Sequence, residues 1–289
     1  MTTAVSPTAT GRAATRTSAP LGRLLGAELR WVLRRPRTLV VLGLLALVPL
    51  AIAIGIATTG GPSSGRGPGL VAQVAGNGFV LPVVALGLSL ALLLPLAVAS
   101  AAADAVAGEA ATGTLRGLLL APVGRMRLIV MKSAGVVTVA VLAVLLIAVV
   151  GMVAGTVVVG GAQGTLVTLS GTSLGVGEAL GRIALVAVWT VGQLLAIGAV
   201  ALAISTLTEH PLVVLASVLG GLIVFGVLSA IPSLEWLQPL LLTTGFTAGT
   251  DVLRDPLPLD GLASSTVRAL VYIAIGLGVT VVRMRRRDA

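Results

Sequence analysis

One stretch of the chain, GEAATGTLRGLLLAPVGRMRLIVMK from Gly108 to Lys132, interrupts a sequence that is otherwise mostly Leu, Val, Ala and Gly. It combines a run of leucines with one carboxylate, three arginines and a lysine. An apolar ridge of this kind can seat in a groove of another protein, and its cations would equally suit a surface of lipid headgroups. We therefore expect recognition, by a protein or by the membrane surface, at this stretch.

The side chains of this chain offer little support for catalysis or for cofactor binding. The chain has no cysteine and one histidine, His210, so neither a zinc site nor a Ser/His pair can be assembled. The one lysine, Lys132, follows Met131 where a phosphate-binding loop requires glycine. We expect no enzyme activity, no catalytic residue, no bound metal and no cofactor in this chain.

The composition is that of an integral membrane protein, with 56% hydrophobic and 10% charged residues. Apolar runs long enough to cross a bilayer of ~30 Å must be helical, because lipid offers the backbone no hydrogen-bond partners. We predict an all-α protein with six transmembrane helices at residues 39–57, 79–103, 133–160, 183–207, 212–231 and 269–282.

The basic residues orient these spans. With the N-terminus inside, fifteen of the nineteen Lys and Arg residues are cytoplasmic, and only Arg66, Arg182, Arg254 and Arg268 lie outside. This distribution follows the positive-inside rule and accounts for the net charge of +9 without a nucleic-acid partner. Both termini are then cytoplasmic.

The N-terminal region divides into two parts. Residues 1–20 have the composition of a disordered tail, and residues 21–37 predict an amphipathic helix along the inner membrane surface. Its polar face carries Arg30 and Arg34, while Glu28 falls on the apolar arc near Arg35. The helix either anchors to anionic lipid alone or also contacts a cytoplasmic partner through Glu28.

The remaining six-span region, residues 38–289, has two long loops. Residues 104–132 form the cytoplasmic loop, and residues 231–265 form an outer segment that mixes Trp236 and a leucine run with Pro and Asp. The outer segment fits a re-entrant or interfacial element, or an ordinary loop with one amphipathic turn. No charged residue lies within the six predicted spans, which disfavours an ion-coupled carrier.

The cytoplasmic loop predicts a short helix of its own. Thr112 or Thr114 can cap it, and Pro122 ends it. The helix itself contains Leu115, Arg116, Leu118 and Leu119. Arg125 then begins the helix of the third span. Glu109 and Arg125 flank the short helix and can pair with each other or with a partner.

The order E-x4-T-L-R-x-L-L-L-A-P-V-x-R-x-R-L-x4-K in this loop resembles that of ABC-2 type transporter permeases. The six spans, the amphipathic first helix and the long last outer loop agree with that family along nearly the whole chain. Gly124 departs from it, because family members often carry Ser or Thr there.

The resemblance implies a transmembrane subunit of an ABC exporter in a bacterial cytoplasmic membrane. It implies a coupling helix at Glu109, Thr114, Leu115, Arg116, Leu118, Leu119, Pro122 and Arg125. It also implies two copies of a separate ATPase subunit that bind ATP and Mg²⁺, and a second permease as homodimer or homologue. Spans two and five would line the substrate pathway at Ser89, Leu93, Ser217 and Phe225.

Two other classes remain open. A stand-alone channel or secondary carrier would transport without a partner ATPase, and a membrane scaffold or assembly factor would not transport. The substrate class is open too, although the absence of charge in the spans favours an amphipathic or apolar molecule.

The topology can be tested in a chain without native cysteines. We expect Ser64→Cys and Ser264→Cys to be labelled by a membrane-impermeant thiol reagent in intact cells, and Arg127→Cys and Arg286→Cys to be protected. Labelling of Arg127→Cys from outside would contradict the orientation and the coupling loop together.

Overall fold

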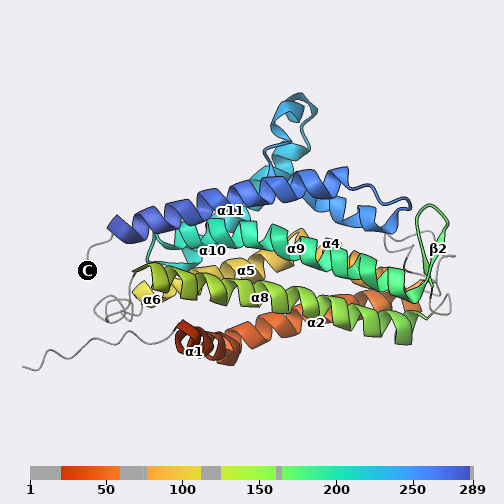
Figure 1. Cartoon of the computed structure of the whole chain (residues 1–289), viewed down its shortest axis with the longest axis horizontal. Helices are drawn as coiled ribbons and strands as arrows, with labels where there is room; N and C mark the ends of the chain where they lie inside the picture. The colour runs from red at the N-terminus through yellow and green to blue at the C-terminus, as the bar shows by residue number, and fades with distance from the viewer. Residues whose placement is uncertain (1–20, 59–73, 75–76, 112–124, 161–164, 287–289) are drawn as a thin grey trace, which may run out of the picture.

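The long helices lie side by side in a computed structural model that describes residues 21–58, 74, 77–111, 125–160 and 165–286 (Figure 1). The elements in chain order are α1 (Leu21–Arg34), α2 (Pro36–Thr58), η2 (Gly78–Val80), α4 (Leu81–Leu90), α5 (Leu93–Ala105), α6 (Ala107–Ala111), α8 (Arg125–Ala154), η3 (Gly155–Val159), β1 (Leu166–Val167), β2 (Ser173–Leu174), α9 (Val176–Ser205), α10 (Pro211–Ser229), η5 (Pro232–Leu237), η6 (Leu242–Leu253) and α11 (Asp260–Arg286).

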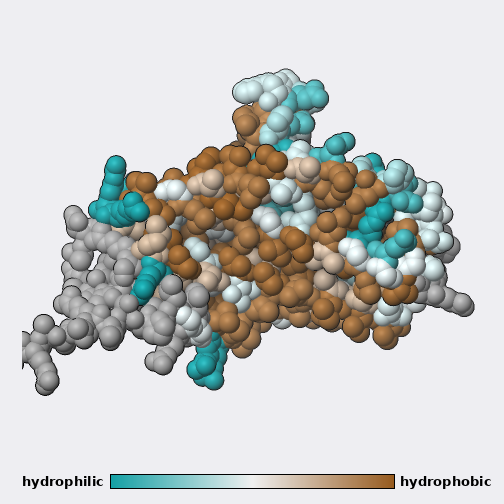
Figure 2. All heavy atoms as spheres, in the orientation of Figure 1, coloured by the Kyte–Doolittle hydropathy of each residue, from teal (hydrophilic) through white to brown (hydrophobic). Residues whose placement is uncertain are grey.

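Several of these helices are suited to cross a membrane. Among the described residues, five are long and apolar enough: Pro36–Thr58, Met126–Val159, Val176–Ser205, Pro211–Ser229 and Asp260–Arg286. The pair Gly78–Leu90 and Leu93–Ala105, bent by 55°, makes a sixth if it crosses as one span. Apolar residues cover much of the visible side of the bundle (Figure 2). The predicted helical membrane fold is confirmed, with five or six spans.

The bend in the second span coincides with one of its two prolines. Pro95 lies in the first turn of α5, where a missing N–H leaves no hydrogen bond unmade, and the break falls just before it, at Ala91 and Leu92. Pro82 instead begins α4 and bends nothing. The sequence predicts kinks at both prolines, and only the one near Pro95 is found.

Two glycines of α8 and η3 allow a close helix contact. An ideal Cβ on Gly155 would lie 2.1 Å from the carbonyl oxygen of Gly78, and one on Gly151 would lie 3.0 Å from Cα of Pro82. Small residues spaced by four let two backbones approach in this way. The GxxxG spacing of Gly151 and Gly155 therefore lets α8 and η3 pack closely on η2 and α4.

A third glycine brings α11 against α9, which lie side by side in Figure 1. A Cβ on Gly276 would lie 2.6 Å from the carbonyl carbon of Ala199. No larger side chain fits at Gly276 unless the two helices separate.

The two ends of the bundle differ. α1, α6 and the C-terminal end of α11 lie at one end, here called the α6 end, and the β1–β2 hairpin lies at the other, the hairpin end (Figure 1). The hairpin is antiparallel, with Leu166 opposite Leu174. α1 ends at Arg34, three residues before the predicted end, because Pro36 begins α2.

The outer segment folds as two 3₁₀-helical elements. The part between α10 and η6 projects sideways from the bundle, and the exposed Trp236 belongs to it (Figure 1). η6 turns back and packs on α9, α10 and α11, burying residues such as Leu242 and Val252. Whether this segment enters the membrane stays a prediction.

Arg182 connects α9 to the end of η6 and the residues that follow it, at the hairpin end. Its guanidinium donates to the carbonyl oxygens of Val252 and Arg254 at 3.3 and 3.0 Å, and it pairs with Asp255 at 3.4 Å. Thr172 of the hairpin donates to the same carboxylate at 3.0 Å. One aspartate therefore ties the hairpin and α9 to the chain after η6.

The close contact at Gly276 predicts a positional effect within one helix. Gly276→Val must push α11 away from α9, and overpacking of this kind typically costs ~1–3 kcal/mol. Gly278→Val, where a Cβ meets nothing within 4 Å, is the matched control. We expect a lower unfolding temperature in detergent for Gly276→Val alone, and equal losses in both variants would contradict the assigned contact.

Candidate functional site

The α6 end carries the two borders of the predicted coupling helix. Its residues Thr114, Leu115, Arg116, Leu118, Leu119 and Pro122 lie outside the described residues. Glu109 lies in α6, just before that segment, and Arg125 is the first residue of α8, just after it. The describable part of the site therefore consists of the contacts that hold α6 and the start of α8 in place.

A buried ion pair connects α6 to α8. The ammonium of Lys132 contacts the Oε1 atom of Glu109, and the two residues are only 4% and 7% exposed. Burying either charge alone would be costly, so each depends on the other. The structure gives Glu109 a contact with Lys132 that the sequence did not predict. The side chain of Arg125 lies outside the description, so the predicted pairing of Glu109 with Arg125 or with a partner protein stays a prediction.

A serine fixes α6 from the other side. The backbone N–H of Ala107 donates to Ser205 Oγ at 2.9 Å, and that hydroxyl donates to the carbonyl of Ala103 at 3.4 Å. Ser205 is the last residue of α9. The junction between α5 and α6 is thereby attached to α9, while Glu109 attaches α6 to α8.

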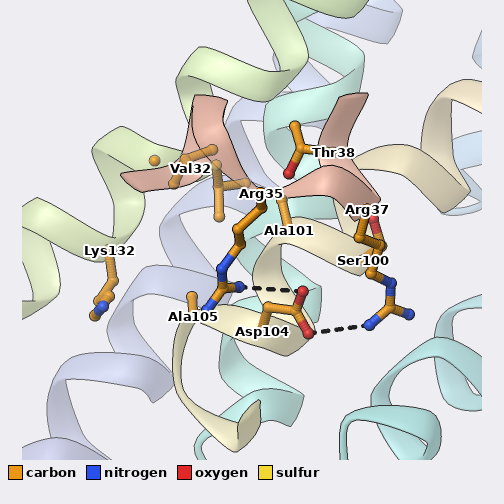
Figure 3. Close-up of a pocket in the computed structure, with 11 residues that line it drawn as sticks. Val32, Arg35, Arg37, Thr38, Ser100, Ala101, Asp104, Ala105 and Lys132 are labelled. Carbon is orange, nitrogen blue, oxygen red and sulfur yellow. Dashed lines mark hydrogen bonds and ion pairs between the residues drawn. The ribbon is translucent and has the colours of Figure 1, made fainter. Parts of the chain in front are cut away.

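Asp104 near the end of α5 holds the junction of α1 and α2. Its two carboxylate oxygens face Arg35 and Arg37, each at 3.2 Å (Figure 3). The sequence places Arg35 near Glu28, whose side chain lies outside the description. Arg30 and Arg34 are exposed on α1, as the predicted polar face requires.

A cavity lies between these groups, lined by Arg35, Asp104 and Lys132 together with Ser100 and Thr38 (Figure 3). Its volume is about 20 Å³. A space of this size accommodates about one water molecule, so it is a seam between helices and not a substrate site.

The four predicted pathway residues lie in different surroundings. Ser89 is fully buried just before the break in the second span, whereas Leu93 and Ser217 are exposed. Phe225 of α10 is half-buried, and its ring meets Tyr272 edge-on with centroids 6.5 Å apart. In this conformation Ser89 contributes to no open surface, and the pathway stays a prediction.

Sequence reasoning missed a polar contact on α11. The helix begins at Asp260, nine residues before the predicted span, so Arg268 lies two turns inside it. Arg268 donates to the carbonyl of Leu241 and to Thr244, and Tyr272 donates to the carbonyl of Leu240 at 2.9 Å. These side chains fix the base of the projecting segment, and no local sequence signal identifies such distant partners.

Within the described ranges, no group of three or more His, Asp or Glu side chains could hold a metal ion. His210 lies in the turn between α9 and α10, where its backbone N–H donates to Thr208 Oγ1 at 3.2 Å. At the α6 end, Glu109 and Lys132 connect α6 to α8, and Asp104 connects α5 to Arg35 and Arg37.

Comparison with known proteins gives one family. The model of the family described as "ABC-2 family transporter protein" matches residues 24–200. A similarity search among curated proteins finds no match. The matched region contains α1 from Leu24 onward, both borders of the predicted coupling helix and α9 up to Val200.

The buried pair predicts strong coupling between two distant positions. Lys132→Met should destabilise the protein by ~3–5 kcal/mol, because it removes the ammonium group that contacts a buried carboxylate. Adding Glu109→Gln removes that charge, and we expect the double variant to recover much of the loss. The measurement is a double-mutant cycle of unfolding in detergent. Additive losses would show that the two side chains do not depend on each other.

Proposed function

The chain belongs to the ABC-2 family of transporter proteins, as its loop motif predicts, and from this premise we propose that it is the permease subunit of an ABC exporter. A separate subunit would bind and hydrolyse ATP with Mg²⁺, and this chain would provide the path across the membrane. Two ATPase copies and a second permease, identical or homologous, would complete the complex.

The observation that carries the proposal is the way both borders of residues 112–124 are anchored. α6 is bound to α8 through Glu109 and Lys132 and to α9 through Ser205. A helix of five residues has little stability of its own, so these contacts are what order it. A force applied to the segment by an ATPase would reach α5, α8 and α9 directly.

The proposed location is the cytoplasmic membrane of a bacterium, with the α6 end inside. The distribution of Lys and Arg supports this orientation. It also makes α1 an inner-surface helix, with Arg30 and Arg34 available to anionic headgroups.

The proposed substrate is amphipathic or apolar. Arg268 lies inside a candidate span, yet its guanidinium is engaged by the carbonyl of Leu241 and by Thr244. The guanidinium of Arg268 therefore stabilises the fold. We retain the inference that the predicted spans, which contain no charged residue, favour an amphipathic or apolar substrate.

The alternative functions predict different experimental results. A channel or carrier would give substrate flux with the purified chain alone, without nucleotide, and a scaffold would give none under any condition. An exporter subunit requires an ATPase partner, which is the property to test first.

We expect Leu118→Asp and Leu119→Asp to insert normally but to lose the ATPase subunit and transport. Truncation of a buried anchor at an interface typically costs at least ~2 kcal/mol, and a charge in an apolar groove costs more. The readout is recovery of the ATPase with affinity-tagged permease. Arg125→Glu should uncouple ATP hydrolysis from transport more than it destabilises the protein.

The matched control is Leu207→Asp, an exposed leucine in the turn between α9 and α10 at the same end of the bundle. It should retain the ATPase, and thiol labelling should confirm the topology of every variant. Full recovery of the ATPase by both loop variants would make residues 112–124 a lipid-surface helix and remove the main support for the exporter.

A further inference from the structure

The second span is buried along most of its length, and its exposed part is the break between α4 and α5. α4 packs on α2 and α8, and α5 packs on α8, α9 and α10. Every residue from Leu81 to Leu86 is buried, as are most residues of α5. The exposed side chains of the two helices lie at the break and within one turn of it: Leu88, Ala91, Leu92, Leu93 and Leu96.

The break leaves backbone groups without hydrogen bonds. Among the described residues, the N–H groups of Leu93 and Leu94 have no acceptor. In the same part of the chain, the carbonyl oxygens of Leu90 and Ala91 have no donor. No side chain caps α5, and the nearby hydroxyl of Ser89 is fully buried and has no partner of its own. The described protein therefore leaves both donors and acceptors unpaired at this point.

Pro95 makes part of this deficit permanent. In a straight helix the carbonyl oxygen of Ala91 would accept from the N–H of residue 95, and proline has no N–H. Straightening the span would therefore not satisfy this carbonyl. Gly87 lies one turn before Ala91, and a Cβ on it would meet nothing within 4 Å. The small residues Gly87 and Ala91 leave the backbone uncovered on this side.

The break lies near the middle of the span. One half of the bent pair, Gly78–Leu90, has 13 residues, and so has the other half, Leu93–Ala105. Each half is about 20 Å long at 1.5 Å per residue, in a span that crosses a hydrocarbon core of ~30 Å. Irregular backbone occurs at such a depth only where protein covers it or where a water-filled cavity reaches it.

Water fits the unpaired groups better than lipid or another apolar helix does. The break presents N–H groups and carbonyl oxygens together, and a water molecule can pair with both kinds. Acyl chains, or a helix face of Leu, Val and Ala, would cover the break but would leave its polar groups unpaired, which is unfavourable.

We propose that a water-filled space reaches the break of the second span in the middle of the membrane. This inference deepens the proposed function and rests on it in one respect, since in the exporter the space is part of the substrate path. The polar part of an amphipathic substrate crosses there beside the unpaired backbone, while the exposed Leu88 and Leu92 contact its apolar part. The substrate is accordingly amphipathic and not wholly apolar.

Single cysteines can report this water, because the chain has no native cysteine. Leu92→Cys, at the break, is compared with Leu145→Cys, near the middle of α8, a helix without proline. The two leucines are similarly exposed, at 43% and 49%. Full-length variants in membrane vesicles are treated with a permanently charged methanethiosulfonate, which reacts with thiolates in water. Labelling after denaturation gives the full extent for each variant.

We expect Leu92→Cys to react at least ~10-fold faster than Leu145→Cys, because each unit by which an apolar surrounding raises a thiol pKa lowers the thiolate fraction about tenfold. Adding Pro95→Ala to Leu92→Cys supplies the missing N–H and should slow the labelling toward that of Leu145→Cys. Adding Pro82→Ala instead, at a proline that begins α4 and bends nothing, should leave the labelling fast.

Three results would overturn the proposal. Equal rates for Leu92→Cys and Leu145→Cys would show that the break is dry. Fast labelling that persists with Pro95→Ala would show that the water does not depend on the break. Labelling of Leu92→Cys only after detergent separates the subunits would show that a second copy covers the break. None of these measurements needs the ATPase, so a failure of the exporter proposal in the Leu118 and Leu119 variants is distinguished from a dry break.

Discussion

The buried contact between Lys132 and Glu109 is the interaction on which the arrangement of the α6 end depends. α6 has five residues, too few to be stable as an isolated helix, and its place is set by what it touches. Desolvation makes each charge unfavourable without the other, so the pair selects one position of α6 against α8. Ser205 adds a neutral contact to α9 and leaves α6 little freedom to move by itself.

The hairpin end is held by a different kind of constraint. There the helices approach through glycine, at Gly78 with Gly155, and no charged residue that the structure describes is buried between them. Arg182 and Asp255 close the hairpin end at the surface. The ion pairs Glu109–Lys132 and Arg182–Asp255 thus lie near opposite ends of the bundle, the first buried and the second partly exposed.

Much of the fold follows from local sequence. Runs of Leu, Val and Ala such as residues 39–57 must become helices in lipid, so their number and approximate position can be read directly. The ends of the helices cannot be predicted in this way, because a helix continues past its apolar run as long as its polar residues find hydrogen-bond partners. α11 begins at Asp260 for this reason, and Arg268 within it depends on the carbonyl of Leu241, 27 residues away.

The candidate site is also predictable from local sequence only in part. The motif around Leu118 identifies the segment that a partner would contact, since its residue types are unusual for the chain. Which cation neutralises Glu109 depends on how α6 folds back on α8, and Arg125 and Lys132 are indistinguishable by charge. Lys132 lies two turns further along the helix, and that depth places it beside α6, where the sequence alone gives no reason to prefer it.

These constraints leave one point of the second span less tightly held than its surroundings. α4 is fixed to α8 where Gly151 meets Pro82, and α5 is fixed at its far end by Asp104 and the Ser205 contacts. Between them, Ala91 and Leu92 belong to neither helix, because Pro95 needs the first turn of α5. In the exporter proposed here, movement of α6 would be transmitted through α5 to this break and absorbed there as a change in the 55° bend. The contacts at the hairpin end would then persist while the α6 end moves.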